Sequence, residues 1–342
     1  MANRRNSRYA AKRVQKKRGR GKLIAAILAV CLLAGGYFVL REYLVFTSEG
    51  IRFVFDEEEP EVSKAAAPGI PAELPETGPE PRISIDRGEL PPADRKELRG
   101  AVLNAAGCDP DTLLSEAHAL HMDGYTAAVV PVKPWSGDIP TEQELRRAAE
   151  VCRAERLRFV AYISCFRDDN AARAEGAPAL RDRKGNLFID SRYCAWLDPA
   201  AEASQSLVRD ACALAVSCGA QELLLDNLCY PFAGNVENID YGRYPPDRWT
   251  VITTFAETLA GEQKVRLGAF VGGDDTFGEG ASESRGQDVT VFAGAFDSLW
   301  VDAGSRREAV SLCGRLRELA GDSAAYCAVV DGEYLAAALL ND

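Results

Sequence analysis

Histidine is scarce in this sequence, since the 342 residues contain only His118 and His121. The two stand at i and i+3, but no third metal ligand follows nearby, and a helix end before Gly124 explains the pair more simply. A histidine-based metal hydrolase is therefore disfavoured, and we expect neither a metal nor a cofactor. The sequence also lacks a G-x-S-x-G nucleophile elbow and a P-loop, which disfavours a serine hydrolase and a P-loop nucleotide site.

Basic residues are sparse outside the N-terminus. Residues 1–22 hold ten of the 40 Lys and Arg residues and no acidic residue, which leaves 30 basic against 51 acidic residues in the rest of the chain. Nucleic-acid binding needs a basic surface, and this acidic body does not provide one. We therefore expect no nucleic-acid partner.

Charge is absent from residues 23–40, whose sequence is LIAAILAVCLLAGGYFVL. At about 1.5 Å per residue, a helix of this length reaches across most of a bilayer core. We predict a transmembrane signal-anchor over 23–45, with the basic tail 1–22 in the cytoplasm and the rest outside a cell membrane. A cleaved signal peptide is the alternative, but its apolar region would be shorter and no small-x-small site follows.

The next segment, 46–95, reads as a linker. It is acidic and has eight prolines between Pro60 and Pro92, so it cannot bury a core and is predicted to be an extended spacer. Residues 96–342 remain as the folded domain.

Cysteine is present without a recognisable pattern. None of the ten cysteines forms a C-x-x-C pair, and the spacings match no zinc site. Cys31 lies in the predicted span, so the other nine cannot all pair internally. We interpret most of them as small buried hydrophobes, which is unusual for an exported protein.

The domain alternates short apolar runs with helical patterns. The helical segments at 141–155 and 305–321 open with capping boxes, Thr141 with Glu144 and Ser305 with Glu308. Runs that are apolar throughout favour strands buried on both faces of a parallel sheet. Seven strands are predicted, at 98–105, 126–133, 158–166, 222–228, 265–271, 297–301 and 324–330.

This alternation predicts an α/β fold, a (β/α) TIM-type barrel. No eighth strand is evident, and the final LAAALLND reads as a short helix. Two interpretations follow: the barrel is incomplete or divergent, or a piece elsewhere in the chain closes it. A doubly wound open sheet is the alternative, although the first strand is not followed by its Gly-rich turn. The connection 167–199 is unusually long, which is typical of functional loops, and it contains a predicted hairpin turning at Lys184-Gly185.

Side chains that follow the strands would line the site of a barrel. Asp226 is the foremost candidate because it directly continues the apolar run Leu223–Leu225, although an ordinary Asp-Asn turn explains it equally well. Asp331 and Glu333 follow the seventh strand but are better explained as solvated surface. The remaining candidates at this face are Lys133, Trp135, Arg167, Asp168, Asp190, Trp196, Asp198, Asn227, Tyr230 and Asp302.

Several of these segments resemble a family of glycoside-hydrolase-like TIM barrels. AQELLLDNLCYP resembles the family strand F-D-E-I-Q-F-D-Y-V-R-F-P, VVPVKPWSGDI is similar to V-I-D-V-K-D-x-x-G, and CFRDDNAA is similar to F-K-D-x-x-L-A. ALRDRKGNLFIDSRYCAWLDP resembles the family hairpin at Asp190, Trp196, Asp198 and Pro199, and RGQDV resembles its G-Q-D. The ordered set covers roughly 98–300.

The resemblance implies a barrel that acts on a polysaccharide or other glycan. It implies Asp226 as nucleophile or base, with Asp168, Asp198 and Asp302 as candidate acids. Lys133, Trp135, Arg167, Asp190, Trp196, Asn227 and Tyr230 would then bind substrate.

The sequence departs from the family pattern at several positions. The fifth-strand aspartate of the family is Phe270 here, its second-strand aspartate is Pro131, and its third-strand lysine is Arg167. The alternative hypothesis is therefore a catalytically degraded barrel that binds glycan without cleaving it, or an envelope scaffold on the same fold.

Overall fold

The computed structural model describes residues 98–136, 138–243, 245–272 and 281–340, and the backbone of 44–47 and 50–53. The chain divides into two units, 1–73 and 74–342. In the first, β1 (Leu44–Thr47) pairs antiparallel with β2 (Gly50–Phe53). The rest of the predicted tail, membrane span and linker lies outside the described residues. No helix among the described residues combines the length and apolar character needed to span a membrane.

The second unit is a closed eight-stranded barrel, which confirms the predicted fold class. The strands follow one another around the barrel in the order β10-β11-β12-β3-β4-β5-β6-β7, and all except β12 run parallel. Seven strands match the predicted ones: β3 (Arg99–Val102), β4 (Ala127–Lys133), β5 (Arg158–Ser164), β6 (Glu222–Asp226), β7 (Arg266–Phe270), β10 (Ser298–Ala303) and β11 (Ala325–Val330).

The expectation of an incomplete barrel was wrong, because β12 (Glu333–Ala336) closes it. This strand pairs antiparallel with β11 on one side and with β3 on the other. Asp331 and Gly332 join β11 to β12 with φ angles of +52° and +83°, the pattern of a two-residue hairpin turn. A four-residue strand that follows such a turn has no preceding helix, so the strand–helix alternation gave no sign of it.

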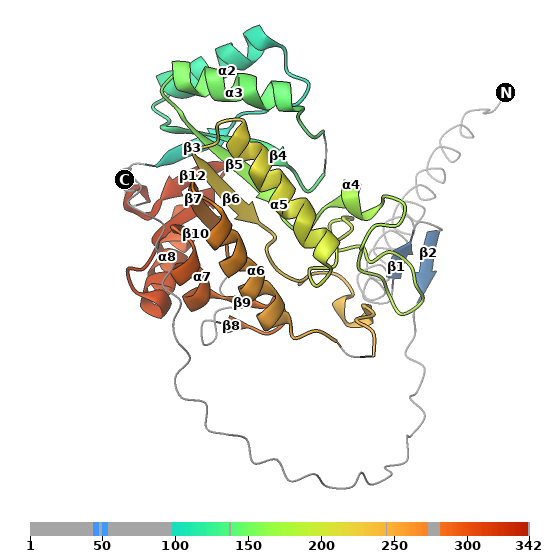
Figure 1. Cartoon of the computed structure of the whole chain (residues 1–342). Helices are drawn as coiled ribbons and strands as arrows, with labels where there is room; N and C mark the ends of the chain where they lie inside the picture. The colour runs from blue at the N-terminus through green and yellow to red at the C-terminus, as the bar shows by residue number, and fades with distance from the viewer. Residues whose placement is uncertain are drawn as a thin grey trace, which may run out of the picture. The chain divides into compact units, whose positions relative to one another are not determined.

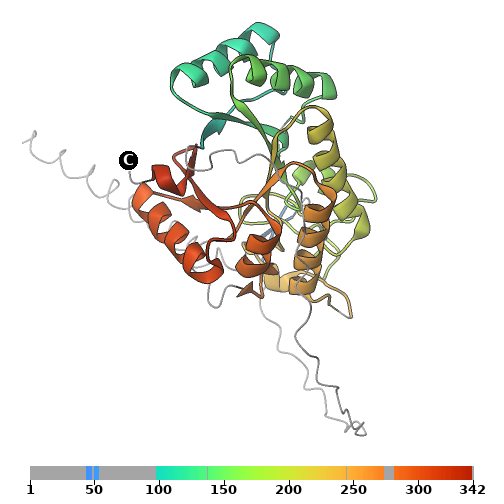
Figure 2. The ribbon, with the colours of Figure 1, turned by 60° about the vertical axis from the view of Figure 1, so that its left-hand side comes forward.

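Helices cover the outside of the barrel (Figures 1 and 2). Thr141 and Glu144 form the predicted reciprocal capping box, and the Ser305 hydroxyl accepts a hydrogen bond from the Glu308 N–H at 3.3 Å. The helices are α2 (Pro110–Met122), α3 (Glu142–Ala154), α4 (Asp169–Ala172), α5 (Glu202–Ser217), α6 (Arg248–Glu262), α7 (Val289–Ala295) and α8 (Arg306–Ala320), with short 3₁₀ turns at Val236–Asn238 and Ala337–Leu339.

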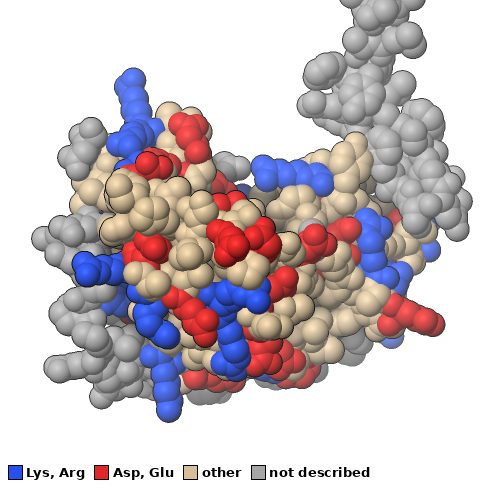
Figure 3. Space-filling view, turned by 90° about the horizontal axis from the view of Figure 1, so that it is seen from above, with Lys and Arg blue, Asp and Glu red and all other residues tan. Residues whose placement is uncertain are grey.

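The outward faces of the helices carry charges of both signs. On α3, Arg146 pairs with Glu142 one turn earlier at 2.6 Å. Figure 3 views the protein from the side on which α2 and α3 lie topmost in Figure 1, and acidic and basic side chains are interspersed there. Mixed charge of this kind keeps a helix surface solvated without creating a strong field of one sign.

Large aromatic side chains fill the barrel interior. Trp300 packs between Phe270 and Tyr334, with ring centroids 6.2 and 5.8 Å away, and donates its indole N–H to the Ser298 hydroxyl at 2.9 Å. The neighbouring strand has Gly268 beside this indole. A Cβ atom on Gly268 would lie 2.5 Å from the Ser298 Oγ and 2.8 Å from the Trp300 Nε1, so the glycine makes room for the tryptophan.

The cysteines behave as the sequence predicted. None of the nine in the described residues forms a disulfide, and all but Cys108 are buried. Burial raises the pKa of Cys152, Cys212 and Cys229 to about 12, so these thiols stay neutral and pack as small apolar groups.

Replacing Gly268 by alanine should destabilise the domain. Overpacking of this kind typically costs about 1–3 kcal/mol, because Trp300 cannot move without disturbing its aromatic neighbours. Chemical denaturation of the full-length chain measures the loss. The matched control is Gly314→Ala on α8, where no atom lies within 4 Å of the new Cβ. This control should gain about 0.5–1 kcal/mol of helix stability. Equal free energies of unfolding in the two variants would contradict the fit at Gly268.

Candidate active site

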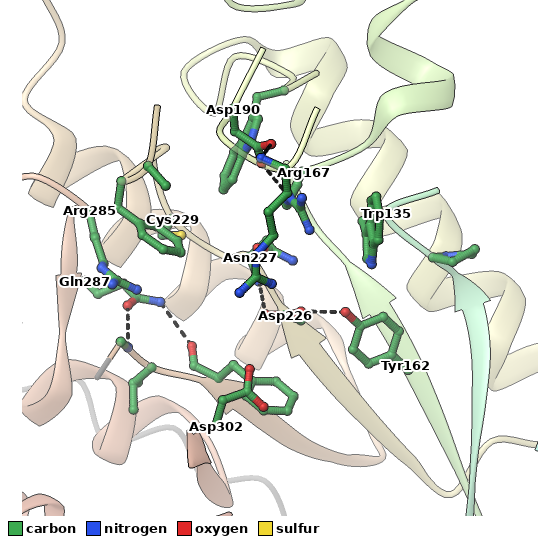
Figure 4. Close-up of a pocket in the computed structure, with 18 of the residues that line it drawn as sticks. Trp135, Tyr162, Arg167, Asp190, Asp226, Asn227, Cys229, Arg285, Gln287 and Asp302 are labelled. Atoms are coloured by element: carbon green, nitrogen blue, oxygen red, sulfur yellow. Dashed lines mark hydrogen bonds and ion pairs between the residues drawn. The ribbon is translucent and has the colours of Figure 1, made fainter. Parts of the chain in front are cut away.

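A cavity of about 650 Å³ opens at the ends of the parallel strands. It is lined by residues of β3, β4, β5, β6, β7, β10 and β12 and of the loops that follow β4, β5, β6 and β7 (Figure 4). The strands are parallel and their carboxyl ends meet at one rim, which is where TIM barrels carry their sites.

Three aspartates line this cavity, and two of them, Asp226 and Asp302, belong to strands of the barrel. Asp226 ends β6 and Asp302 lies near the end of β10, with β7 between the two strands. Leu224 and Trp300 point into the barrel interior, and Asp226 and Asp302 follow them by two residues on the same strands. Because side chains alternate along a strand, both aspartates also face inward, nearer the carboxyl ends of the strands. Figure 4 shows both aspartates at the pocket.

Asp226 is held by two hydrogen bonds. The Tyr162 hydroxyl donates to its Oδ2 at 2.5 Å, and the backbone N–H of Asn227 donates to its Oδ1 at 2.7 Å. Burial raises the pKa of Asp226 above its ordinary value, while these two donors lower it by stabilising the carboxylate. Asp226 therefore accepts hydrogen bonds suited to its ionised form.

Asp302 has a different environment. Burial raises its pKa above the ordinary value, and the negative charge of Asp226 raises it further, while Arg192 lowers it. The side chain is nevertheless open to the cavity, so water reaches it. Two acids whose surroundings differ in this way can divide the roles of proton donor and ionised carboxylate.

Asn227 explains why β6 ends on an Asp-Asn pair. Its φ angle of +52° is in the left-handed region, which asparagine tolerates better than most residues. The side-chain amide donates to the Ser164 hydroxyl at 3.0 Å, and that hydroxyl donates to the Arg167 carbonyl at 2.7 Å. The turn thus joins the end of β6 to the end of β5.

The long loop after β5 reaches the cavity through Arg167, Asp190 and Trp196. Arg167 Nε and Trp196 Nε1 both donate to Asp190 Oδ2, at 2.7 and 3.0 Å. Burial alone would raise the pKa of Asp190, but these donors and the Cys194 N–H hold it below its ordinary value. The predicted hairpin at Lys184-Gly185 is confirmed, with Arg181 bridged to Leu187 across it.

Aromatic side chains border the cavity beside this loop. Trp135 is 37% exposed, and the Arg167 guanidinium lies 4.3 Å from its ring centroid. Trp196 is buried and meets Phe232 edge-on at 6.4 Å. The partly exposed indole of Trp135 presents an apolar surface at the cavity.

Four of the sequence candidates do not reach the cavity wall. Lys133 is buried and pairs with Asp168 at 2.6 Å, and it donates to the carbonyls of Ser164 and Cys165. Asp168 also caps α4 by accepting from the Ala171 N–H at 2.9 Å. Lys133 and Asp168 therefore stabilise the start of the loop that follows β5.

Asp198 is half-buried and Tyr230 is buried, and neither lines the cavity. Asp198 accepts a hydrogen bond from the Ala200 N–H at 3.0 Å, and burial raises its pKa. Tyr230 is fully buried and packs edge-on against Tyr241. Glu333 does not face the cavity either, since it bonds to Arg99 and Tyr125 on the outer surface of β12.

Sequence reasoning missed several cavity residues: Tyr162, Arg192, Phe232, Arg285, Gln287 and Tyr334. Alternation along β5 could have revealed Tyr162, which points into the barrel two residues before Ser164. Gln287 lies within RGQDV and is buried, with its side chain bonded to Gly272 N and Phe270 O at 3.1 and 3.0 Å. Tyr334 lies on the strand that had no sequence signal.

Residues 125–299 match the model of a family described as "Putative glycosyl hydrolase domain". The match covers just over half of the 342 residues. The chain belongs to this family. The resemblance found in the sequence motifs is thereby confirmed. A search of curated proteins found no match.

Solved structures match the chain at low identity and with TM-scores below 0.5. A hypothetical protein from Ruminiclostridium thermocellum is 18% identical with a TM-score of 0.42, over 49% of this chain and 96% of that one. A cycloisomaltooligosaccharide glucanotransferase from Paenibacillus sp. is 14% identical with a TM-score of 0.48, over 69% and 38%. The maltogenic α-amylase AmyB from Thermotoga neapolitana is 12% identical with a TM-score of 0.44, over 68% and 58%. The chain spans less than two thirds of the length of either enzyme.

Replacing Asp226 by asparagine should lower the pKa of Asp302, because the negative charge that raises it is removed. The measurement is a carbon-13 NMR titration of the labelled aspartate carboxyls. Asp210→Asn on the exposed face of α5 removes one charge outside the cavity and should leave Asp302 unchanged. If Asp302 titrates identically in all three proteins, the two carboxyl groups do not interact as described.

Proposed function

We propose that the domain is a glycoside hydrolase that acts on a polysaccharide. The observation that carries the proposal is the pair of inward-facing aspartates, Asp226 and Asp302, on the wall of one cavity in a barrel of this family. Glycoside hydrolysis needs two carboxyl groups on opposite sides of the scissile bond, one to protonate the leaving oxygen and one to act as base or nucleophile.

The surroundings of the two acids suggest their roles. Asp226 accepts hydrogen bonds from the Tyr162 hydroxyl and the Asn227 N–H, which favour its carboxylate form, so it is the proposed base or nucleophile. No hydrogen bond to the Asp302 side chain is found in the described part of the chain, and the charge of Asp226 favours its protonated form. Asp302 is the proposed acid, in preference to Asp168 and Asp198, which do not line the cavity.

Other side chains at the cavity would bind and orient the sugar. Trp135 presents an exposed ring, while Arg167, Asn227 and Trp196 line the wall around Asp226. A cavity with an aromatic wall and a few polar groups is the usual form of a site for a ligand of this size.

The alternative is a barrel that binds glycan without cleaving it. Phe270 favours this alternative, since it lines the cavity where the family pattern has an aspartate. Phe270 is the last residue of β7, the strand between those of Asp226 and Asp302, so β7 has no carboxyl group at this position. Activity measurements separate the two functions.

Asn substitution of either acid should lower the rate of polysaccharide hydrolysis by about 10²–10⁴-fold, the usual contribution of acid–base catalysis. The assay measures new reducing ends released by the full-length chain from a panel of polysaccharides. Asp210→Asn is the matched control and should retain full activity. Unchanged rates in Asp226→Asn would remove Asp226 from the mechanism. Binding without any release of reducing ends by the unmodified chain would favour the non-catalytic alternative.

The proposal includes a location at a cell membrane, with residues 23–45 as a single-pass anchor and the barrel outside the cytoplasm. It is supported by the uncharged run 23–40 and the ten basic residues that precede it.

The full-length chain should sediment with membranes and resist extraction by alkaline carbonate, and deletion of 1–45 should release the domain. In sealed inverted membrane vesicles, added protease should cut the basic tail but not the barrel. Digestion of the barrel in intact inverted vesicles would contradict the orientation.

A further inference from the structure

The guanidinium of Arg167 has a donor that the described part of the protein leaves unused. Arg167 is only 6% exposed and lines the cavity. Its Nε donates to Asp190 at 2.7 Å, but its Nη2 is buried and has no hydrogen-bond partner among the described residues. A buried charged donor without an acceptor is costly, and such groups are usually completed by a ligand or a water molecule.

Asp190 cannot supply the missing acceptor. Its Oδ2 already accepts from Arg167 Nε and Trp196 Nε1, and its Oδ1 accepts from the backbone N–H groups of Arg192 and Cys194 at 2.8 and 3.0 Å. With two donors on each oxygen, the carboxylate holds Arg167 in place and is itself fully used. The indole of Trp135 lies against the Arg167 guanidinium and restricts the orientation of the guanidinium from that side as well. Figure 4 shows the guanidinium between Asp190 and Trp135 at the cavity.

Two more arginines border the same cavity, Arg192 and Arg285. The Arg285 guanidinium lies 3.5 Å from the centroid of the Phe232 ring. Outside residues 1–22 the chain has 30 basic against 51 acidic residues, yet the cavity wall has three arginines against three aspartates. Asp190 and Arg167 pair with each other, which leaves two arginines and two aspartates. Basic groups are therefore as numerous as acidic ones at the cavity, whereas acidic groups predominate in the domain as a whole.

We propose that the cavity recognises an acidic glycan, and that a sugar carboxylate binds at Arg167. This inference rests on the proposed function and names its substrate class. A neutral hydroxyl can accept a hydrogen bond from Nη2, but a carboxylate forms a shorter and stronger charge-assisted bond with it. The planar guanidinium is suited to a planar carboxylate, and Trp135 beside it would pack against the ring of the same sugar.

The test compares acidic oligosaccharides with their neutral counterparts. Calorimetry measures binding of the full-length chain to oligogalacturonides and to hyaluronan, alginate and muramic-acid-containing oligosaccharides. Each is paired with a carboxyl-reduced form that has the same linkages. At least one acidic form should bind tenfold or more tightly than its reduced counterpart, and the preference should shrink as salt is added. Equal affinities within every pair would overturn the inference, as would tighter binding of a sulfated oligosaccharide than of every carboxylated one.

A protein variant tests the role of Arg167 itself. Arg167→Lys keeps the charge that faces Asp190 but removes Nη2, and it should reduce the preference for the acidic form by about tenfold. Arg173→Gln is the matched control, since Arg173 pairs with Asp169 on the exposed side of α4. This control should keep the full preference. An unchanged preference in Arg167→Lys would overturn the assignment. If that variant fails to fold, the binding of each acidic and carboxyl-reduced pair to the unmodified chain, and its salt dependence, still test the preference for acidic glycans.

The outcomes separate the two proposals. Binding or cleavage of neutral glycans with no preference for acidic ones would contradict the acidic substrate and leave the hydrolase proposal standing. Failure to bind any glycan would contradict both.

Discussion

Closure of the barrel by β12 is the constraint on which the rest of the domain depends. β12 pairs with β11 and β3 at once, so no strand of the ring is left with an unpaired edge. The pairing of β6 and β10 with β7 brings Asp226 and Asp302 to one wall, and closure of the ring adds Tyr334 of β12 to the lining of the cavity they face. β12 also contributes Tyr334, which packs on Trp300 below that cavity. A four-residue hairpin strand thus completes both the fold and the floor of the site.

Along the barrel axis, an aromatic layer lies below the aspartates that line the cavity. Trp300 fits because Gly268 leaves room beside it, and Asp302 lies two residues further along the same strand, above the aromatic layer. Above an apolar floor an acid is expensive to ionise, and the pKa of Asp226 is accordingly raised. Stability contributed by a carboxyl of raised pKa is present below its unfolded pKa and is lost as the pH rises through its folded pKa. The domain therefore gives up some stability at neutral pH to keep the carboxyl groups at the cavity, as functional sites commonly do.

The loop after β5 determines the character of the cavity. Asp190 fixes Arg167 and Trp196 together, and Lys133 with Asp168 supports the start of the loop from below. The strands supply the two acids, whereas the loop after β5 supplies Arg167, Arg192 and Trp196, and the loops after β4 and β7 supply Trp135 and Arg285. This division is the usual one in barrels, where a rigid scaffold positions the chemistry and the loops set specificity.

The sequence alone determined the fold class, seven of the eight strands, the capping of α3 and α8 and the position of Asp226 at a strand end, because these follow from local periodicity and from residues next to one another in the chain. The family followed as well, since its motifs recur in order. Only the tertiary structure separated Asp302 from Asp168 and Asp198, because a carboxylate that caps a turn and one that faces a cavity look alike in sequence. It also revealed β12 and Tyr334, and the unused donor of Arg167. Each of these depends on contacts between residues far apart in the chain, which no local pattern records.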